Sequence, residues 1–439
     1  MKKFDSDSFE DDEKELKFKL SIGSVITSFG FWFITLICVL VIVFTFAYSG
    51  SKDKEHEEDL VLVEDTELKS ADNNYEFYLN SFDSLMSKNS DNLVYSPYSE
   101  KLCLTLVLNG MDTESESYNQ LSSAMGYNTS DLNEVYSNIE LSKSSLAKKD
   151  DVLVSNSIWY DKEVSDSKNS DYFDNMKKNY EADTFEVDLS SYDFVKSANS
   201  YVADKTNRMI NMILQEPLSD DAKLMLMNVL YMNSKWYYEF LNEDTYADTF
   251  NDDEKVMFMH QSTKFEYAHD KGLEMLKLPY TNDLEMVLIK SDSDKDTYEV
   301  WNNLSLEDRV GIINDSEYSS DTTVDLSLPK FEVKSTLNLK KSLVSLGVCD
   351  IFKNEINSIP NIVDDESLFL SDVIQSVKLR CDEEGTEAAA VTIAIVKCDS
   401  LALEPETIEY NVNKPFMYII RDKESGDWLF MGYMKSIVE

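Results

Sequence analysis

The chain has 439 residues, of which 43% are hydrophobic and 12% aromatic. This apolar content excludes a disordered chain and is enough for one large globular domain or two medium ones. Asp and Glu number 83 against 41 Lys and Arg, and the net charge of −42 excludes nucleic acid as a partner because its phosphates would be repelled. The five cysteines form no disulfide framework and no zinc motif, so we expect neither a metal site nor a cofactor.

An apolar segment near the N-terminus contains no charged residue from Leu20 to Ser51. It is longer than the roughly 20 residues that a membrane-spanning helix needs. Lysines are more numerous before it than directly after it. The sequence therefore predicts a cytoplasmic tail at 1–20, a transmembrane anchor at 21–50 and an extracellular remainder at the plasma membrane. A cleaved signal peptide, with Ala47 and Ser49 at the cleavage site, is the alternative. Residues 51–70 are interpreted as an acidic linker and 71–439 as the folded domain.

Periodic patterns predict helices first and strands mostly later. Helices are expected at 73–87, 97–110, 115–125, 131–146, 170–180 and 192–214. Ser96 and Pro97 are typical of a helix start, with serine as the cap and proline in the first turn. Strands are expected at 92–95, 151–159, 224–233, 255–268, 272–278, 284–290, 322–328 and 373–381. This order predicts an α+β fold rather than alternating βαβ units.

Sequence motifs of common enzymes are missing. The histidines are His56, His260 and His269, and none belongs to HExxH. The sequence also lacks GxSxG, the Walker loop and GxGxxG. A pair of catalytic carboxylates cannot be recognised by motif among 83 acids. The sequence therefore predicts that the protein is not an enzyme.

A C-terminal stretch combines acids, a glycine and a run of small residues. It comprises Glu383, Glu384, Gly385, Thr386, Glu387, Ala388, Ala389, Ala390, Val391 and Thr392. Such a segment has little bulk and can form a strand. On its own it is interpreted as a buried strand or a frayed helix, but motifs elsewhere in the chain change that interpretation.

Several motifs, in the same order, resemble those of the serpin family of protease inhibitors. They lie at Asn92–Ser99 (NLVYSPYS), Ala198–Ile210, Asn228–Phe240, Leu276–Tyr280 (LKLPY), Leu326–Phe352, Asn413–Phe416 and Phe430–Gly432. The stretch that begins at Glu383 resembles the hinge of the family's reactive loop. The resemblance runs from about residue 73 to 438, which is essentially the whole predicted extracellular part.

The resemblance implies helices packed on a large central, mostly antiparallel sheet with an exposed reactive loop. A target protease cleaves the loop, and the cut loop inserts into the sheet before the covalent acyl-enzyme link can hydrolyse. The protein is then expected to be a monomeric suicide substrate of serine or cysteine proteases at the outer cell surface. A non-inhibitory serpin-like protein with a binding or structural role at the surface is the alternative.

The resemblance also assigns roles along the loop. Glu383 to Thr392 form the hinge, and the alternate residues Thr386, Ala388, Ala390 and Thr392 are all small enough to be buried by insertion. The family's usual loop length places the reactive bond between Asp399 and Ser400. Lys397, Leu401 and Leu403 stay as alternatives for the cleaved residue, because the far side of the loop is longer here than in compact members.

Six residues outside the loop are implied to support opening of the sheet: Ser96, Ser99, Asn228, Trp236, Lys330 and Gln375. Gln375 stands where many members have a histidine, and a hydrogen-bonded cluster with Ser96, Ser99 and Asn228 is expected. Glu383 and Lys330 are expected to form a partly exposed ion pair of modest strength. Ser234 replaces a glycine that usually precedes Trp236.

Overall fold

The computed structural model describes residues 64–89, 91–127, 130–220, 222–314, 316–320, 322–353, 355–363, 368–370, 373–386 and 407–437, with side chains from residue 74 onward. The predicted tail, anchor and most of the linker fall in residues 1–63, outside the described residues. Within the described ranges, no helix is long and apolar enough to span a membrane.

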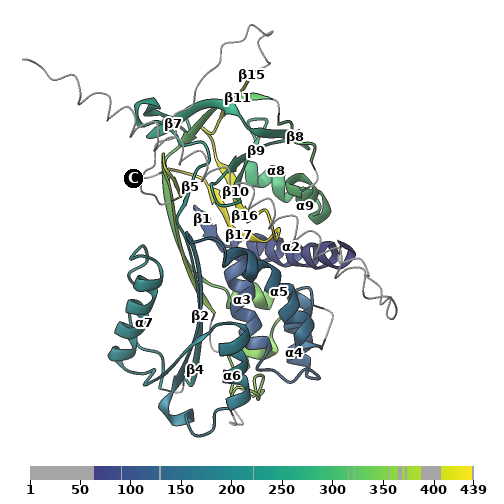
Figure 1. The fold of residues 1–439 in the computed structure, drawn as a ribbon, viewed down its shortest axis with the longest axis vertical. Helices are drawn as coiled ribbons and strands as arrows, with labels where there is room; N and C mark the ends of the chain where they lie inside the picture. Colours follow the sequence, from purple (N-terminus) through teal and green to yellow (C-terminus); the bar gives the residue numbers. More distant parts are fainter. Residues whose placement is uncertain are drawn as a thin grey trace, which may run out of the picture. The chain divides into compact units, whose positions relative to one another are not determined.

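The helices are concentrated in the first part of the described chain (Figure 1). They are α2 (Glu64–Met86), α3 (Pro97–Leu108), α4 (Glu116–Ala124), α5 (Leu132–Leu146), α6 (Ser170–Asn179), α7 (Tyr192–Lys205), α8 (Thr297–Asn302), α9 (Leu306–Asn314) and α10 (Lys340–Ser345). Three short 3₁₀ helices are η1 (Lys162–Val164), η2 (Asn242–Asp244) and η3 (Asp350–Phe352). The six predicted helices are confirmed, although α2 begins earlier, inside the segment interpreted as a linker. Helices α8 to α10 were not predicted.

Local sequence explains where two of these helices begin and end. At the start of α3, the Ser96 hydroxyl accepts a hydrogen bond from the Ser99 backbone N–H (3.3 Å), and Pro97 occupies the first turn. Helix α7 ends earlier than predicted, because Asn207 and Arg208 adopt left-handed φ angles of 47° and 64°. A left-handed pair cannot continue a right-handed helix, so the chain turns away there.

The strands form four sheets. The six-stranded sheet contains, in spatial order, β1 (Leu93–Tyr95), β17 (Trp428–Met434), β16 (Phe416–Asp422), β10 (Leu284–Ser291), β9 (Leu273–Pro279) and β8 (Glu266–Asp270). A four-stranded sheet contains β15 (Thr407–Asn411), β11 (Thr323–Pro329), β7 (Glu254–Lys264) and β6 (Thr245–Phe250). A second four-stranded sheet contains β12 (Phe331–Asn338), β13 (Ile374–Cys381), β14 (Gly385–Thr386) and β5 (Ser234–Lys235). The last sheet contains β3 (Asp183–Val187), β2 (Val152–Asp161) and β4 (Leu224–Met232).

The predicted strand at 255–268 is wrong as a single element. The structure divides it into β7 and β8, which belong to different sheets. The break falls at Phe265, whose side chain is only 3% exposed. Burying this ring in the core turns the chain from one sheet to the other. Because most pairings are antiparallel and helices and strands are segregated, the predicted α+β class is confirmed.

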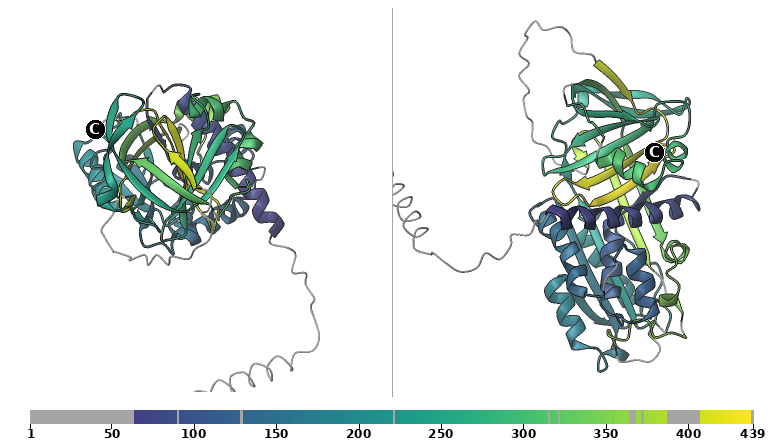
Figure 2. Two further views of the ribbon diagram at one scale, coloured as in Figure 1. Left: turned by 90° about the horizontal axis from the view of Figure 1, so that it is seen from above. Right: turned by 90° about the vertical axis from the view of Figure 1, so that its right-hand side faces the viewer.

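Helices cover both faces of strands β2 and β4 (Figure 1). Helix α7 lies on one face, where Trp159, Phe194 and Val202 belong to a small apolar cluster with Met227 and Val229 of β4. Helices α3, α5 and α6 lie on the other face, over the main core. Helix α2 runs between these helices and the six-stranded sheet (Figure 2). Strands β2 and β4 therefore have helices packed on both faces, and they remain partly exposed at several positions.

The expected large central sheet is present as two parts. One part ends at β4 and the other contains β13, and no ladder joins these two strands within the described residues. β12 pairs with one edge of β13, and at one end of the other edge the short strand β14 pairs with β13 and with β5. The split between β4 and β13 is the feature on which the candidate site depends.

Candidate functional site

The first residues of the predicted hinge form a short strand at the end of the split. In β14, Gly385 pairs with Lys235 and Thr386 pairs with Ser234 of β5, while Thr386 also pairs with Cys381 of β13. All these pairings are antiparallel. The hinge therefore has begun to pair between two strands before any cleavage. The remaining predicted hinge residues, Glu387 to Thr392, and the predicted reactive bond at Asp399 and Ser400 lie outside the described residues.

Gly385 allows the hinge to lie against the backbone of β5. A Cβ atom built on Gly385 would lie 2.2 Å from the Ser234 carbonyl oxygen and 2.7 Å from Lys235 Cα. Contacts this short with main-chain atoms cannot be relieved by moving a side chain. Glycine is therefore required for this close approach.

The segment that begins at Trp236 holds three consecutive carbonyl groups at the base of the hinge. The Trp236 indole N–H donates to the Asp382 carbonyl oxygen (2.9 Å), and its backbone N–H donates to that of Glu384 (3.0 Å). The Phe240 backbone N–H donates to the Glu383 carbonyl oxygen (3.0 Å). The Trp236 ring, which is 2% exposed, stacks on Tyr280 with centroids 4.5 Å apart. Trp236 thus fixes the point from which the loop departs.

An ion pair lies at the same end of the split. Lys330 Nζ lies 2.6 Å from Glu383 Oε2, and the side chains are 34% and 8% exposed respectively. Burial by itself favours the neutral form of Glu383, but the hydrogen bond and charge of Lys330 outweigh it and lower the pKa of this carboxyl. The pair is partly exposed, as the sequence predicted, and it connects the hinge to the residue between β11 and β12.

Thr386 points into the interior. Its side chain is 2% exposed, and its hydroxyl lies 2.8 Å from the Tyr280 hydroxyl. Burial raises the pKa of Tyr280 well above its ordinary value, so the phenol stays neutral. A small side chain with a hydroxyl fits this position, whereas a long or charged side chain would have to displace buried neighbours.

A narrow cavity continues from Thr386 along the split. Leu230 and Met232 of β4 line it on one side and Leu379 of β13 on the other, while Ile210, just after α7, also contributes. Within the described residues, no strand ladder joins β4 and β13 along this cavity. A strand that continued from Thr386 in the direction of the cavity would lie between β4 and β13.

The first turn of α3 is hydrogen-bonded to both sides of the split. The Ser96 backbone N–H donates to Gln375 Oε1 (3.0 Å), and Gln375 Nε2 donates back to the Ser96 carbonyl oxygen (2.8 Å). The Ser99 hydroxyl donates to Asn228 Oδ1. Gln375 belongs to β13 and Asn228 to β4. The structure thus brings the four predicted support residues together in two pairs, one for each half of the sheet.

Two further residues of this site did not emerge from the sequence. Asn156 of β2 accepts a hydrogen bond from Asn228 Nδ2 through its Oδ1 (2.8 Å), which extends the cluster across a third strand. Tyr280 contacts both Trp236 and Thr386. Tyr280 is the last residue of the LKLPY motif, so the sequence drew attention to it, but the sequence did not show which residues it contacts. Asn156 carries no recognisable signal.

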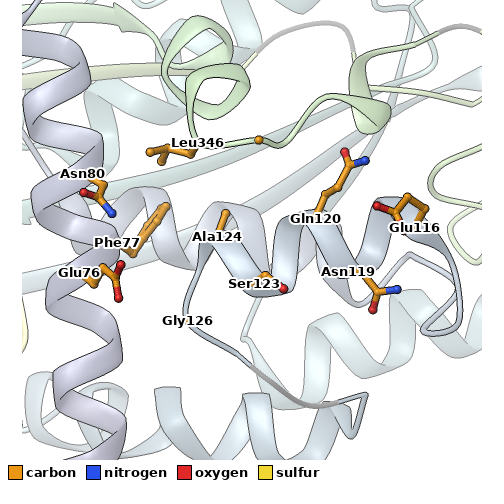
Figure 3. Close-up of a pocket in the computed structure, with 11 residues that line it drawn as sticks. Glu76, Phe77, Asn80, Glu116, Asn119, Gln120, Ser123, Ala124, Gly126 and Leu346 are labelled. Carbon is orange, nitrogen blue, oxygen red and sulfur yellow. The ribbon is translucent and has the colours of Figure 1, made fainter.

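A separate pocket lies between α2 and α4, away from the hinge. Figure 3 shows Glu76, Phe77 and Asn80 of α2 facing Gln120 and Ser123 of α4 across it. The Gln120 side chain is used structurally, since its Oε1 accepts hydrogen bonds from the backbone N–H groups of residues 349 and 350. We interpret this pocket as a junction between helices. Among the described residues, no group of three or more potential ligands could hold a metal ion.

The described residues define an α+β protein whose central sheet is divided between β4 and β13, with a short strand of the C-terminal segment paired at one end of the division. The family model described as "Serpin (serine protease inhibitor)" matches residues 72–437, and the chain belongs to the serpin family. Members of this family are protease inhibitors and not catalytic enzymes, and several relatives of this chain are named as inhibitors.

Named relatives and solved structures agree with this assignment. An uncharacterized serpin-like protein from Methanosarcina acetivorans is 30% identical over 393 residues, covering 85% of this chain and 87% of its own. A leukocyte elastase inhibitor from Xenopus laevis is 29% identical over 376 residues, covering 82% and 97%. The crystal structure of the thermophilic serpin tengpin in the native state has a TM-score of 0.73 at 24% identity, covering 88% and 96%. This structural likeness supports the fold.

Proposed function

We propose that this serpin inhibits serine or cysteine proteases as a suicide substrate. The observation that carries the proposal is the split between β4 and β13, which is already entered at one end by Gly385 and Thr386. Loop insertion needs an open edge on both sides and a loop that starts between them. The missing ladder between β4 and β13 within the described residues, and the pairing of β14 between β13 and β5, support the proposal.

The protease carries out every chemical step up to the cleavage of the loop. The protease's nucleophile attacks the carbonyl carbon of the cleaved residue, the peptide bond breaks, and the nitrogen of the following residue leaves as an amine after taking up a proton. An ester or thioester to the protease stays on the loop. If the loop inserts before water attacks this link, the protease is pulled out of its working geometry, and about 1 Å of displacement already costs on the order of a hundredfold in rate.

The loop composition favours an inhibitor over a non-inhibitory member of the family. Since Thr386 points inward, the alternation of a strand gives the same orientation to Ala388, Ala390 and Thr392 after insertion. All are small, so none would stall the strand by burying bulk or charge. We place the reactive bond between Asp399 and Ser400, with Lys397, Leu401 and Leu403 as the competing residues.

Covalent trapping tests the function directly. The domain from residue 64 onward is mixed with trypsin-, chymotrypsin- and subtilisin-like proteases and an aspartate-directed protease. Each mixture is examined on denaturing gels. We expect an SDS-resistant complex with at least one of them, and mass spectrometry of the released loop fragment identifies the cleaved bond. Turnover of the loop by every protease without any complex would contradict the inhibitory function and favour the surface-binding alternative.

We also propose that residues 21–50 anchor the protein in the plasma membrane, with 1–20 in the cytoplasm, 51–70 as a linker and the serpin domain outside the cell. The uncharged run and the excess of lysines ahead of it support this arrangement. Extraction of membranes with alkaline carbonate tests it, since an anchored chain stays in the pellet. Release of the full-length chain into the supernatant would contradict the anchor.

A further inference from the structure

Exposed apolar side chains are concentrated next to the loop. Ten large apolar side chains are exposed in the described part of the chain, and four of them occur between residues 237 and 257. These are Tyr237, Leu241, Tyr246 and Met257, with exposures of 57%, 55%, 54% and 39%. The other six are distributed over the rest of the domain. Tyr246 pairs with Phe258 and Met257 pairs with Ala247, so Tyr246 and Met257 lie on opposite faces of β6 and β7. Tyr246 is the one that shares a face with His260.

This region surrounds the points where the loop is attached. The segment that carries Tyr237 and Leu241 holds the hinge through the hydrogen bond from Phe240 to Glu383. Tyr246 and Met257 belong to β6 and β7, in the same sheet as β15, which begins at Thr407 on the far side of the loop. Figure 1 and Figure 2 show this sheet at one end of the domain. The apolar group and the loop attachments therefore share one end of the molecule.

The same sheet carries unneutralised acids. Asp244, Tyr246, Asp248, His260, Asp325 and Glu409 line one shallow groove, which we call the β6–β15 face. Asp325 and Glu409 are directly opposite each other in the ladder of β11 and β15. Among the described residues, none of these four carboxylates is in an ion pair. β11 and β15 are parallel, and the two carboxylates at paired positions repel each other, so a positive partner would be attracted to them.

Tyr246 is held in a defined position on this face. Its ring stacks on His260 with centroids 3.9 Å apart and an angle of 5° between the planes. The histidine is fixed by its own contacts, since Nδ1–H donates to the Asp244 carbonyl oxygen (3.0 Å) and Nε2 lies 3.1 Å from the Ser327 hydroxyl. A rigid, half-exposed tyrosine beside carboxylates is the type of residue that anchors protein interfaces.

We propose that the β6–β15 face is a second contact surface for the target protease and favours proteases with basic residues beside the active-site cleft. This inference rests on the proposed function. Thr407 lies eight positions after Asp399, so the reactive bond stays within about 26 Å of β15 even in a fully extended chain. A protease domain of about 230 residues has a radius of gyration of about 17 Å. A protease that engages the bond is therefore within reach of this face.

Other occupants fit the charge less well. A second copy of this chain brings the same net charge of −42, and an anionic lipid surface is also negative, so both are repelled. A basic protease surface is attracted. Such attraction mainly raises the rate of association and weakens with salt.

The test uses the cationic and anionic forms of trypsin, which share specificity for Arg and differ in charge. Asp399→Arg and Lys397→Gln are introduced throughout, so that position 399 is the cleaved residue for both forms and Lys397 offers no second trypsin site. Two further variants are made in this background: the double variant Asp325→Asn and Glu409→Gln, and the single variant Tyr246→Ala. Each is compared with the background protein. The control pair is Asp166→Asn and Asp174→Asn, which removes the same charge from exposed positions at or near α6, at the other end of the domain (Figure 1). The measured quantity is the second-order rate constant of inhibition at low and at moderate salt.

We expect the Asp325/Glu409 pair of substitutions to lower the rate constant for cationic trypsin by 3- to 10-fold at low salt and to leave that for anionic trypsin within twofold. Tyr246→Ala is expected to lower both, and the Asp166/Asp174 control pair neither. Covalent complexes that form at equal, salt-insensitive rates in all variants would overturn this inference alone. Absence of any complex with either trypsin would overturn the proposed function and this inference with it.

Discussion

Glu100 is a carboxyl group buried in the core, on the same helix as the serines that contact both halves of the sheet. Its side chain is 1% exposed and accepts a hydrogen bond from the Tyr95 hydroxyl. Burial raises the pKa of Glu100 to about 7, although the Tyr95 and Ser81 hydroxyls partly oppose this shift. The next residue, Lys101, is equally buried, with Nζ 3.7 Å from Asp427 Oδ1. Two adjacent ionisable groups are therefore buried at the start of α3.

The raised pKa of Glu100 predicts stability that falls between about pH 4.5 and 7. In this window the native state keeps a proton that the unfolded state, with an ordinary value of 4.5, has released. The free energy of unfolding should therefore fall as pH rises, by up to about 3 kcal/mol, and become level above pH 7. Glu100→Gln keeps the size and removes the ionisation, so it should flatten this slope. Urea unfolding from pH 5 to 8 measures it.

The control for Glu100 is Glu134→Gln, at an exposed position on α5. This variant should keep the slope of the unmodified protein. If Glu100→Gln and the unmodified protein show the same dependence on pH, the shift at Glu100 does not contribute to stability.

The first turn of helix α3 is hydrogen-bonded to both parts of the central sheet. On the β13 side the partner is the Gln375 side chain, which is 7% exposed. Gln375→Leu removes the partner of the buried Ser96 N–H (3.0 Å) and should lower the free energy of unfolding by about 1–3 kcal/mol. Denaturant unfolding measures this loss. Ile374→Ala, at the neighbouring position where the side chain is 45% exposed, should change stability little. Equal stability of the two variants would show that the hydrogen bonds between Gln375 and Ser96 contribute little to the free energy of unfolding.

Elements with a local pattern could be predicted from the sequence, and elements created by distant pairing could not. The helices at α3 to α6 have caps and apolar periodicity within a few residues. Strands β5 and β14 have two residues each and exist because they pair with each other, 150 positions apart in the chain. Strand β3 carries exposed acids at Asp183 and Glu186 and is defined by its parallel pairing with β2.

The same limit applies to the candidate site. The family motifs identified Trp236, Lys330 and the hinge as single residues. They did not show that no ladder joins β4 and β13 within the described residues, or that Thr386 contacts Tyr280, because those relations depend on register between segments more than 100 residues apart. The contact of Asn156 with Asn228 likewise depends on register, between strands 72 residues apart in the chain.

At the scale of the whole molecule, no ladder joins β4 and β13 within the described residues, which leaves a position for one more strand in the sheet. If the cut loop inserts, about ten new ladder hydrogen bonds at ~0.5–1.5 kcal/mol net each would add roughly 5–15 kcal/mol. An unfolding entropy of about 2.1 cal/mol/K per residue converts this, for the 376 residues of the folded unit, into a rise in melting temperature of roughly 6–19 °C. Cleavage in the loop by a protease that is not inhibited should therefore stabilise the protein.

Thermal unfolding before and after such cleavage measures this rise, and Thr386→Arg is the matched control. The Thr386 side chain is 2% exposed beside Tyr280, so an arginine there would have to bury its charge for the loop to enter the split. The cleaved Thr386→Arg protein should melt close to the temperature of its uncleaved form, and it should be turned over as a substrate without forming a complex. An unmodified protein whose melting temperature does not change on cleavage would show that the loop stays out of the sheet. A complex formed undiminished by Thr386→Arg would show that trapping does not need insertion at this position.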